Sequence, residues 1–209
     1  MTRVKIILIL LMGLTLPLNA CLDLKQPSNK IEYYSLEYDP PRIGDHQPVS
    51  HVIKVELFSV SPIYNTRKII YRDDAYKRAA YDYHKWQANP AELVTYFLAR
   101  DMRHSGLFKA VVTRNSRFPY AYVLGGSVDE FLESDMQSGW QADLSLNILL
   151  ISEHETDASK KIIFQKSYRI RKPCRQKNPR ALAEAMSAAM SEASAQIIHE
   201  VYNRLAGRQ

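Results

Sequence analysis

Residues 140–151, WQADLSLNILLI, contain the alternation of apolar residues that decides the fold. Successive side chains of a β-strand point to opposite faces, so this period of two predicts a strand with one buried face. The buried face is expected to carry six side chains: Trp140, Ala142, Leu144, Leu146, Ile148 and Leu150. No other strand pattern in the chain is as regular.

The segments on either side show related patterns. KIIFQKSYRIR, residues 161–171, alternates as well, and its inward side chains are expected to be Ile162, Phe164, Tyr168 and Ile170. Residues 120–133, YAYVLGGSVDEFLE, are predicted to form a long strand in which Gly125 and Gly126 mark a bulge or a bend. Because the polar stretches 134–139 and 152–160 would be hairpin loops, the three strands predict an antiparallel meander.

Four shorter strands are predicted before this meander, at residues 33–38, 52–58, 68–72 and 108–112. In the strand VIKVELF, the expected buried side chains are Ile53, Val55 and Leu57. Residues 73–88, DDAYKRAAYDYHKWQA, have no clean period and are interpreted as a turn or an irregular segment.

Two helices are predicted. Residues 89–92, NPAE, combine a capping Asn, a Pro suited to the first turn and a Glu that can reach back, and Gly106 supplies a C-terminal stop. The second helix begins at residues 178–179 and carries an apolar stripe as far as Leu205, with Gly207 after it. We expect this stripe to pack on the sheet; the alternative is that part of it contacts a partner helix.

This order of elements predicts one α+β domain over residues 32–207. We expect a mostly antiparallel sheet of about six to seven strands, with two main helices packed on one face. The length of 209 residues suits a single domain, and 46% hydrophobic with 24% charged residues is ordinary for a globular protein.

Residues 1–20 predict a secretory signal. Two basic residues precede the apolar run IILILLMGLTLPL, residues 6–18, which is shorter than the roughly 20 residues of a spanning helix. The sequence Leu18-Asn19-Ala20-Cys21 resembles the lipobox of bacterial lipoproteins. That resemblance implies cleavage between Ala20 and Cys21, transfer of a diacylglycerol to the Cys21 thiol, and acylation of the new N-terminus.

The alternative for Cys21 is a disulfide with Cys174, the other cysteine of the chain, in a plain secreted protein. If Cys21 is acylated, Cys174 is a buried or quiet thiol, or pairs between chains. By resemblance to lipoprotein sorting rules, Leu22 in place of Asp implies the periplasmic face of the outer membrane. Residues 21–31 would then be the acylated cysteine and a tether reaching at most roughly 35 Å.

The net charge is +6, and loss of Arg3 and Lys5 with the leader would leave +4. This excess is compatible with attraction to anionic lipid headgroups and equally with an ordinary solvated surface. No run of Lys and Arg has the density of a nucleic-acid-binding stripe, so no nucleic-acid partner is expected.

Sequence motifs for chemistry are absent. The chain has no Gly-rich phosphate loop, H-E-x-x-H, C-x-x-C or G-x-S-x-G, and its six histidines are not spaced as metal ligands. We therefore expect no enzyme activity, no catalytic residues, no metal and no cofactor; the alternative is an envelope hydrolase assembled from distant residues. The acidic cluster at Asp129, Glu130, Glu133 and Asp135 is interpreted as a solvated rim.

Residues 64–86, YNTRKIIYRDDAYKRAAYDYHKW, interleave aromatic and basic side chains. Tyr, Trp and Arg supply most hot spots of protein–protein interfaces, and amphipathic rings also suit the headgroup level of a membrane. The simpler interpretation is that the rings fill the edge of the core. If the segment is a partner surface, its side chains are Tyr64, Arg67, Tyr71, Arg72, Tyr76, Tyr81, Tyr83, His84 and Trp86.

The order and spacing of several short motifs resemble one known family. They are Y-Y-x-L at residues 33–36, Y-x-x-x-x-I-x-Y-R and Y-x-Y-H-x-W-x-x-x-P within residues 64–90, S-G-L-F after the first helix, and YVLGGSVDEFLESD leading into WQADLSLNILL. Together they resemble the auxiliary lipoprotein component of ABC-type transport systems, the group that includes the paraquat-inducible lipoprotein. The likeness runs from about residue 32 to residue 205.

The resemblance implies a non-enzymatic subunit that acts beside an ABC ATPase, a permease and a protein with mammalian-cell-entry (MCE) domains. Such systems are linked to moving phospholipid or other hydrophobic molecules across the Gram-negative envelope. The subunit would sit in the outer membrane through its acyl chains and dock or tether the MCE component, with a homo-oligomer compatible with a ring-forming partner. The alternative is a periplasmic lipid-binding shuttle with an apolar pocket between sheet and helices.

Overall fold

The computed structural model describes residues 30–44, 46–114, 116–136 and 139–207. The predicted signal, its cleavage site at Ala20 and Cys21, and the tether as far as residue 29 lie outside the described residues. From Ile31 onward the chain forms one compact unit, called the body below. Since every core residue of the described chain lies in the body, we expect the body to fold without the segment before it.

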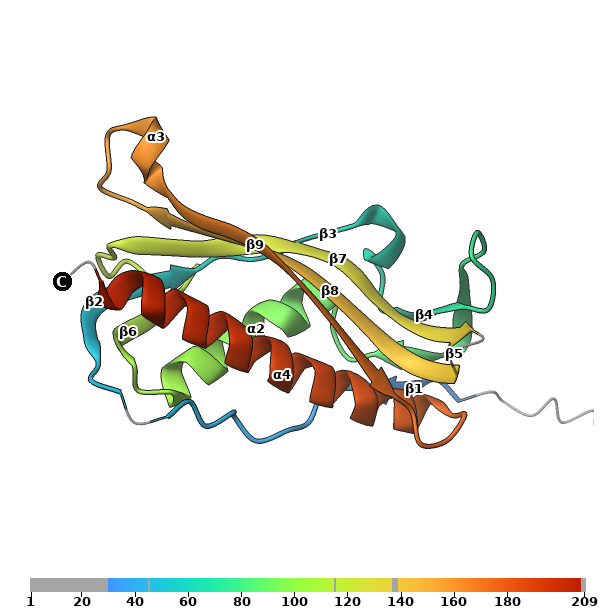
Figure 1. Cartoon of the computed structure of the whole chain (residues 1–209). Helices are drawn as coiled ribbons and strands as arrows, with labels where there is room; N and C mark the ends of the chain where they lie inside the picture. Colours follow the sequence, from blue (N-terminus) through green and yellow to red (C-terminus); the bar gives the residue numbers. More distant parts are fainter. Residues whose placement is uncertain (1–29, 45, 115, 137–138, 208–209) are drawn as a thin grey trace, which may run out of the picture. The chain divides into compact units, whose positions relative to one another are not determined.

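The body is built on one sheet, to which the described residues contribute nine strands (Figure 1). The longest, β7, pairs along one edge with β2, β3 and β4 in turn, each in parallel, and along its other edge with antiparallel β8. Beyond these, β6 pairs with β2, β5 with β4, β1 with β5, and β9 with β8. The strands are β1 Glu32–Tyr34, β2 Val49–Val55, β3 Ser59–Val60, β4 Lys68–Arg72, β5 Ala79–Trp86, β6 Phe108–Thr113, β7 Tyr122–Met136, β8 Gly139–Ser152 and β9 Ile162–Pro173.

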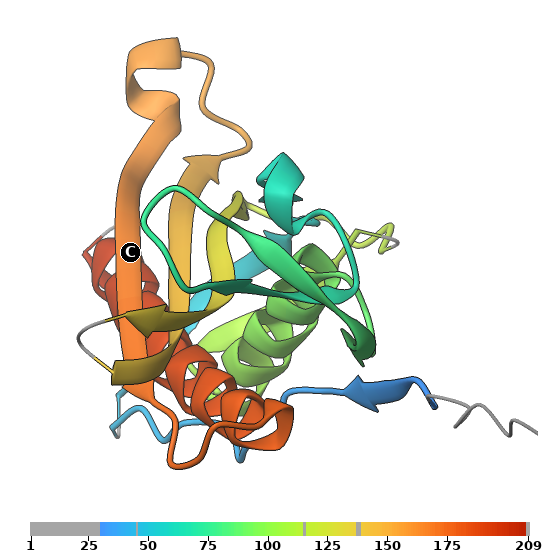
Figure 2. The ribbon, with the colours of Figure 1, turned by 90° about the vertical axis from the view of Figure 1, so that its right-hand side faces the viewer.

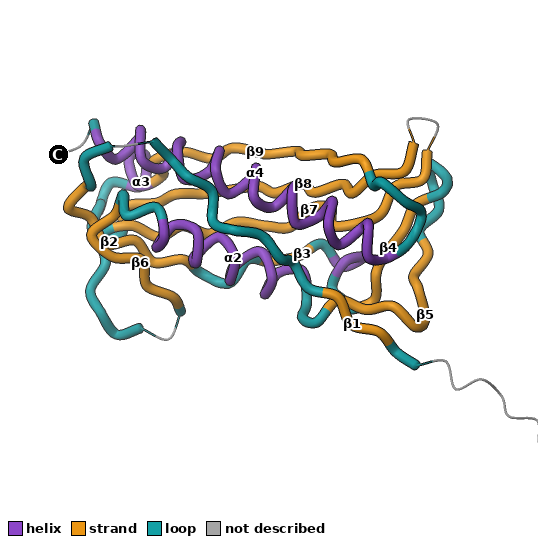
Figure 3. Tube along the Cα trace, turned by 90° about the horizontal axis from the view of Figure 1, so that it is seen from below, coloured by secondary structure: helices purple, strands orange, loops and turns teal. Residues whose placement is uncertain are grey.

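Two helices, α2 (Pro90–His104) and α4 (Pro179–Ala206), lie side by side on one face of the sheet (Figure 3). The sequence sets the ends of α2 as predicted, because Asn89 and Glu92 form a capping box and Gly106 adopts a φ of +66° after the helix. A short helix α3 (Ala158–Lys161) interrupts the β8–β9 connection, and a 3₁₀ turn η1 (Pro62–Tyr64) follows β3.

The core lies between the sheet and the two helices. The predicted stripe of α4, which includes Leu182, Met186 and Ile197, is fully buried against the inner face of β8 and β9. That inner face carries the alternating side chains of the opening stretch, and Leu144, Leu146, Ile148 and Leu150 are each 0% exposed. The predicted packing of the second helix on the sheet is thereby confirmed.

The expectation of a mostly antiparallel sheet is wrong, because the sheet is mixed. Parallel neighbours need a long crossover, and the stretch from β2 to β6, which includes α2, supplies one. The part of the expectation that is met is the α+β class with two main helices on one face of the sheet. The meander of β7, β8 and β9 is antiparallel as predicted.

Four local expectations also fail. The segment 73–88 contains the strand β5, whose pairing with β4 shifts register between residues 68 and 70, and this irregularity removed the period from the sequence. Leu57 is 46% exposed because β2 ends at Val55, and Ile162 is 54% exposed at the start of β9. The irregularity in β7 falls between Val128 and Glu130, beyond the predicted glycine pair.

Between β1 and β2 the chain crosses both helices without secondary structure of its own (Figure 3). We call residues 35–44 and 46–48 the strap. Within the strap, Leu36 is 1% exposed, and the Tyr38 hydroxyl donates to the buried Asp101 of α2 at 2.7 Å. At the far end of the strap, the hydroxyl of Tyr202 on α4 donates to the carbonyl of Gln47 at 3.0 Å. The strap therefore connects the two helices.

Candidate functional site

The segment predicted as a partner surface forms η1, β4, β5 and the loop between the two strands. Figure 2 looks directly at this end of the body, where β1 lies beside β5. Six of the nine side chains lie on β4 and β5, the other three lie in η1 and the loops, and the nine differ widely in exposure. Their positions separate the residues that hold the fold from those that can meet another molecule.

On the face toward the helices, the aromatic side chains fill the edge of the core. Trp86 is 1% exposed and meets Phe131 edge to face, with ring centroids 5.1 Å apart. Tyr71 and Tyr81 pack with their ring centroids 5.0 Å apart, and the Tyr81 hydroxyl donates to Glu133, 3.1 Å from each carboxylate oxygen. This part of the segment follows the simpler interpretation, in which the rings complete the core.

The half-buried His84 joins this edge to β1. Its ring lies against both Tyr81 and Tyr34, with centroids 5.7 and 5.9 Å away. The carboxylate of Glu32 is 3.3 Å from the His84 Nδ1 and also accepts from the Tyr34 hydroxyl at 2.6 Å. These contacts hold the short strand β1 against β5.

On the opposite face, Arg72 lies in a buried ion-pair network. Its Nη2 is 2.6 Å from an oxygen of Asp143, a residue with no exposed surface, and Arg72 also donates to the Ser134 hydroxyl. Glu130 lies 3.8 Å from Arg72, and Arg171 approaches Asp143 at 3.7 Å. Tyr64 is also buried on this face, in a small cluster with Ile70 and Leu132. Both predicted partner residues are thus enclosed by the fold.

The interpretation of the acidic cluster as a solvated rim is wrong for Glu133, which is 2% exposed. Burial is the main cause that raises the pKa of the Glu133 carboxyl, and the hydrogen bond from Tyr81 opposes it. Burial likewise raises the pKa of Asp143, against the attraction of Arg72 and Arg171. Both carboxyls lie on strands that have neighbours on both edges, Glu133 on β7 and Asp143 on β8.

Three residues of the segment remain available at the surface: Arg67, Tyr76 and Tyr83. Tyr76 is 98% exposed in the β4–β5 loop, and Tyr83 is 45% exposed on β5. The Arg67 guanidinium lies over the ring of Tyr33 on β1, 5.0 Å from its centroid. Sequence reasoning missed Tyr33 as a site residue, although its place soon after the tether was a usable signal.

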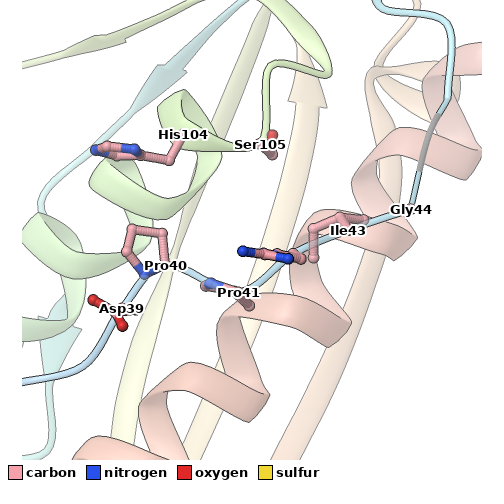
Figure 4. Close-up of a pocket in the computed structure, with 8 residues that line it drawn as sticks. Asp39, Pro40, Pro41, Ile43, Gly44, His104 and Ser105 are labelled. Atoms are coloured by element: carbon pink, nitrogen blue, oxygen red, sulfur yellow. The ribbon is translucent and has the colours of Figure 1, made fainter.

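A separate cavity of about 660 Å³ lies between the strap and the C-terminal end of α2 (Figure 4). Its lining includes Asp39, Pro40 and Pro41 from the strap, and His104 and Ser105 from the helix end. The cavity is open and has no apolar interior suited to a lipid chain. Among the described residues, no three His, Cys, Asp or Glu side chains gather as a metal site would require.

Cys174 is half-buried after β9, and burial raises the pKa of its thiol to about 12. A thiol with so high a pKa carries almost no thiolate at neutral pH. The alternative prediction for this thiol is a disulfide with Cys21, and Cys21 lies outside the described residues.

A family model described as ABC-type transport auxiliary lipoprotein component matches residues 34–198. The chain belongs to this family. It is therefore a transport-associated lipoprotein of the cell envelope, anchored to a membrane and associated with an ABC transport system. In the described part of the chain, no helix has the length and apolar character needed to cross a membrane.

Solved structures share the fold of this family member at low sequence identity. A protein from Xanthomonas campestris is 16% identical with a TM-score of 0.74, and the alignment covers 85% of this chain and 99% of that one. A hypothetical protein from Chlamydia trachomatis is 9% identical with a TM-score of 0.53, over 76% of this chain and 99% of that one. Comparison with curated proteins gave no match.

Proposed function

We propose that the chain is a non-enzymatic outer-membrane lipoprotein, acylated at Cys21, that docks or tethers the MCE component of an envelope transport system. The observation that carries this proposal is the family match over most of the body, combined with the lipobox-like sequence before it. The cargo would be phospholipid or another hydrophobic molecule. Energy would come from the ATPase of the same system, acting through its permease.

The packing of the body supports an adaptor over a lipid-carrying shuttle. A carrier needs an apolar cavity between sheet and helices, of a few hundred Å³ or more. In the body this interface is occupied by side chains such as Met186, Met190 and Phe131, each at most 1% exposed. A docking subunit instead works through its surface, and the β4–β5 loop with Tyr76 supplies a projecting aromatic side chain for that purpose.

The anchor is tested by fractionating cells that express the full chain with Cys21→Ala. We expect the variant to leave the outer-membrane fraction, because several acyl chains are what make anchoring stable. Cys174→Ala is the matched control, since it removes the other thiol and should stay in the membrane. A Cys21→Ala protein that is soluble and fully active in transport would contradict the tethering role.

Docking is tested with a photo-crosslinking residue at position 76 in the full chain. We expect it to capture the MCE protein in cells. Position 162 is the control, because Ile162 is also exposed, at 54%, but lies on β9 beside α3, at the other end of the body (Figure 1). Equal capture from both positions, or none from position 76, would exclude the β4–β5 loop as the docking surface.

A further inference from the structure

We propose that the end of the body formed by β1 and β5 lies on the anionic headgroups of the membrane that holds the anchor. The contact would involve Tyr33, Arg67 and Lys85, together with the neighbouring Ile31 and Lys68. The inference rests on the acylation of Cys21 proposed above, because the anchor is what brings this end of the body to the membrane.

The tether determines which end of the body faces the lipid. Ile31, where the body begins, is ten positions after Cys21 in the chain. Even fully extended, a stretch of this length reaches at most about 35 Å. The chain enters the body through β1, so the β1–β5 edge is within this span of the membrane, whereas α3 lies at the opposite end (Figure 1).

The side chains at this edge combine an aromatic ring with three cations. Tyr33 of β1 pairs with Lys85 of β5, which in turn pairs with Lys68 of β4. Directly opposite residues of neighbouring strands project from the same face, so these three form one row. Arg67 lies over the Tyr33 ring, and Tyr33 and Ile31 are 50% and 40% exposed.

The charges at the edge leave two cations without a carboxylate partner. Lys68 pairs with Asp82 at 3.1 Å, and Glu32 is engaged by His84 and Tyr34. In the described residues, neither Arg67 nor Lys85 forms an ion pair with an acidic side chain. Within the described part of the chain, Arg67 donates its Nε to the Trp86 carbonyl at 3.3 Å, and its terminal amino groups have no hydrogen-bond acceptor there and can bind a phosphate.

This composition fits a membrane interface. Tyrosine places its ring at headgroup level with the hydroxyl in water, and Lys and Arg are attracted to anionic lipid. Such attraction is weak for a free protein, but a short tether keeps the local lipid concentration high, which is how a second signal strengthens lipid anchoring. A protein partner at the same edge is the competing occupant, and the experiment below separates the two.

The test uses the body without the anchor, because the body contains its own core. Its binding is measured to vesicles of equal parts phosphatidylglycerol and phosphatidylethanolamine, and to vesicles of phosphatidylcholine. We expect weak but measurable binding of the unanchored body to the anionic vesicles, and less binding to the neutral ones. Arg67→Gln with Lys85→Gln should weaken binding to the anionic vesicles roughly 30-fold, since each cation near the surface contributes about fivefold.

The matched control is Lys160→Gln with Lys161→Gln, which removes the same charge at α3. If the inference holds, this pair changes binding far less than the first. The inference is overturned if the body does not bind anionic vesicles, or if both pairs weaken binding equally. It is also overturned if Arg67→Gln with Lys85→Gln abolishes capture of the MCE protein from position 76 while leaving vesicle binding intact.

The two proposals fail separately in these experiments. If the body does not bind vesicles, but attachment still depends on Cys21 and position 76 still captures the MCE protein, only the membrane contact is excluded. If position 76 does not capture the MCE protein, but the unchanged body binds anionic vesicles, the docking role is excluded and the membrane contact is supported.

Discussion

Replacing Arg72 with methionine should strongly destabilise the body, because it leaves the Asp143 carboxylate buried without its closest cation. Asp143 is 0% exposed, and Arg72 is 2.6 Å from it, whereas Arg171 stays 3.7 Å away. Removing one member of a buried pair costs about 3–5 kcal/mol. That is a large share of the roughly 5–15 kcal/mol that stabilises a typical domain.

Urea unfolding of the body measures this loss. With an m-value of about 2 kcal/mol/M, a cost of 4 kcal/mol lowers the midpoint by about 2 M. The double variant Arg72→Met with Asp143→Leu should recover most of it, since Leu132 and Ile70 offer apolar neighbours on the same face. The double-mutant cycle then gives a coupling energy well above 1 kcal/mol.

The loss of unfolding free energy in Arg72→Met should depend on pH, which supplies a second check. Burial already raises the pKa of Asp143 above the ordinary carboxyl value of about 3.9. The ionisation of Asp143 therefore lowers the free energy of unfolding as the pH rises from that ordinary value through the raised pKa. Without Arg72 the pKa rises further, so the deficit of Arg72→Met should be larger at neutral pH than near pH 4. Additive single variants, or a deficit independent of pH, would refute the reasoning.

Three further predictions concern other parts of the body. Gly126→Ala should cost about 1–3 kcal/mol in urea unfolding, because its Cβ would lie 2.0 Å from a backbone oxygen of β8, whereas Gly125→Ala meets nothing within 4 Å and should cost less. Tyr38→Phe should lower the unfolding free energy by about 1.5–3 kcal/mol, since it removes the hydrogen bond to the buried Asp101 carboxylate; an unchanged midpoint would show that the strap is not held there. In a Cys21→Ala background, alkylation of Cys174 should be much slower in the folded protein than in urea, because burial raises the pKa of its thiol to about 12, and equal rates would contradict this.

Short stretches of sequence were enough to predict some helices and strands, because the patterns that specify them lie within a few residues. The ends of α2 follow from its capping residues and Gly106, and the buried face of β8 follows from strict alternation. The strand β4 was predicted with its observed ends, 68–72. Each of these depends on residues only a few positions apart.

Other features depend on partners far away in the chain. Three separate strands share one edge of β7, and no periodicity within β2, β3 or β4 specifies that arrangement. Arg72 and Glu133 look like surface residues by type, and only the neighbouring strands make Arg72 half-buried and Glu133 buried. For the candidate site, the sequence therefore indicated the correct segment but could not separate its structural residues from its exposed ones.

The strap also determines how the body responds to a mechanical pull from the membrane. Force on the tether acts first on β1, which is held by a three-residue parallel pairing with β5. Peeling this strand would release residues 31–35, about 17 Å of extended chain, before the load reaches the buried side chain of Leu36. If the chain is anchored through Cys21 as proposed, this reserve of length would let the body follow a moving partner while the strap keeps both helices in place.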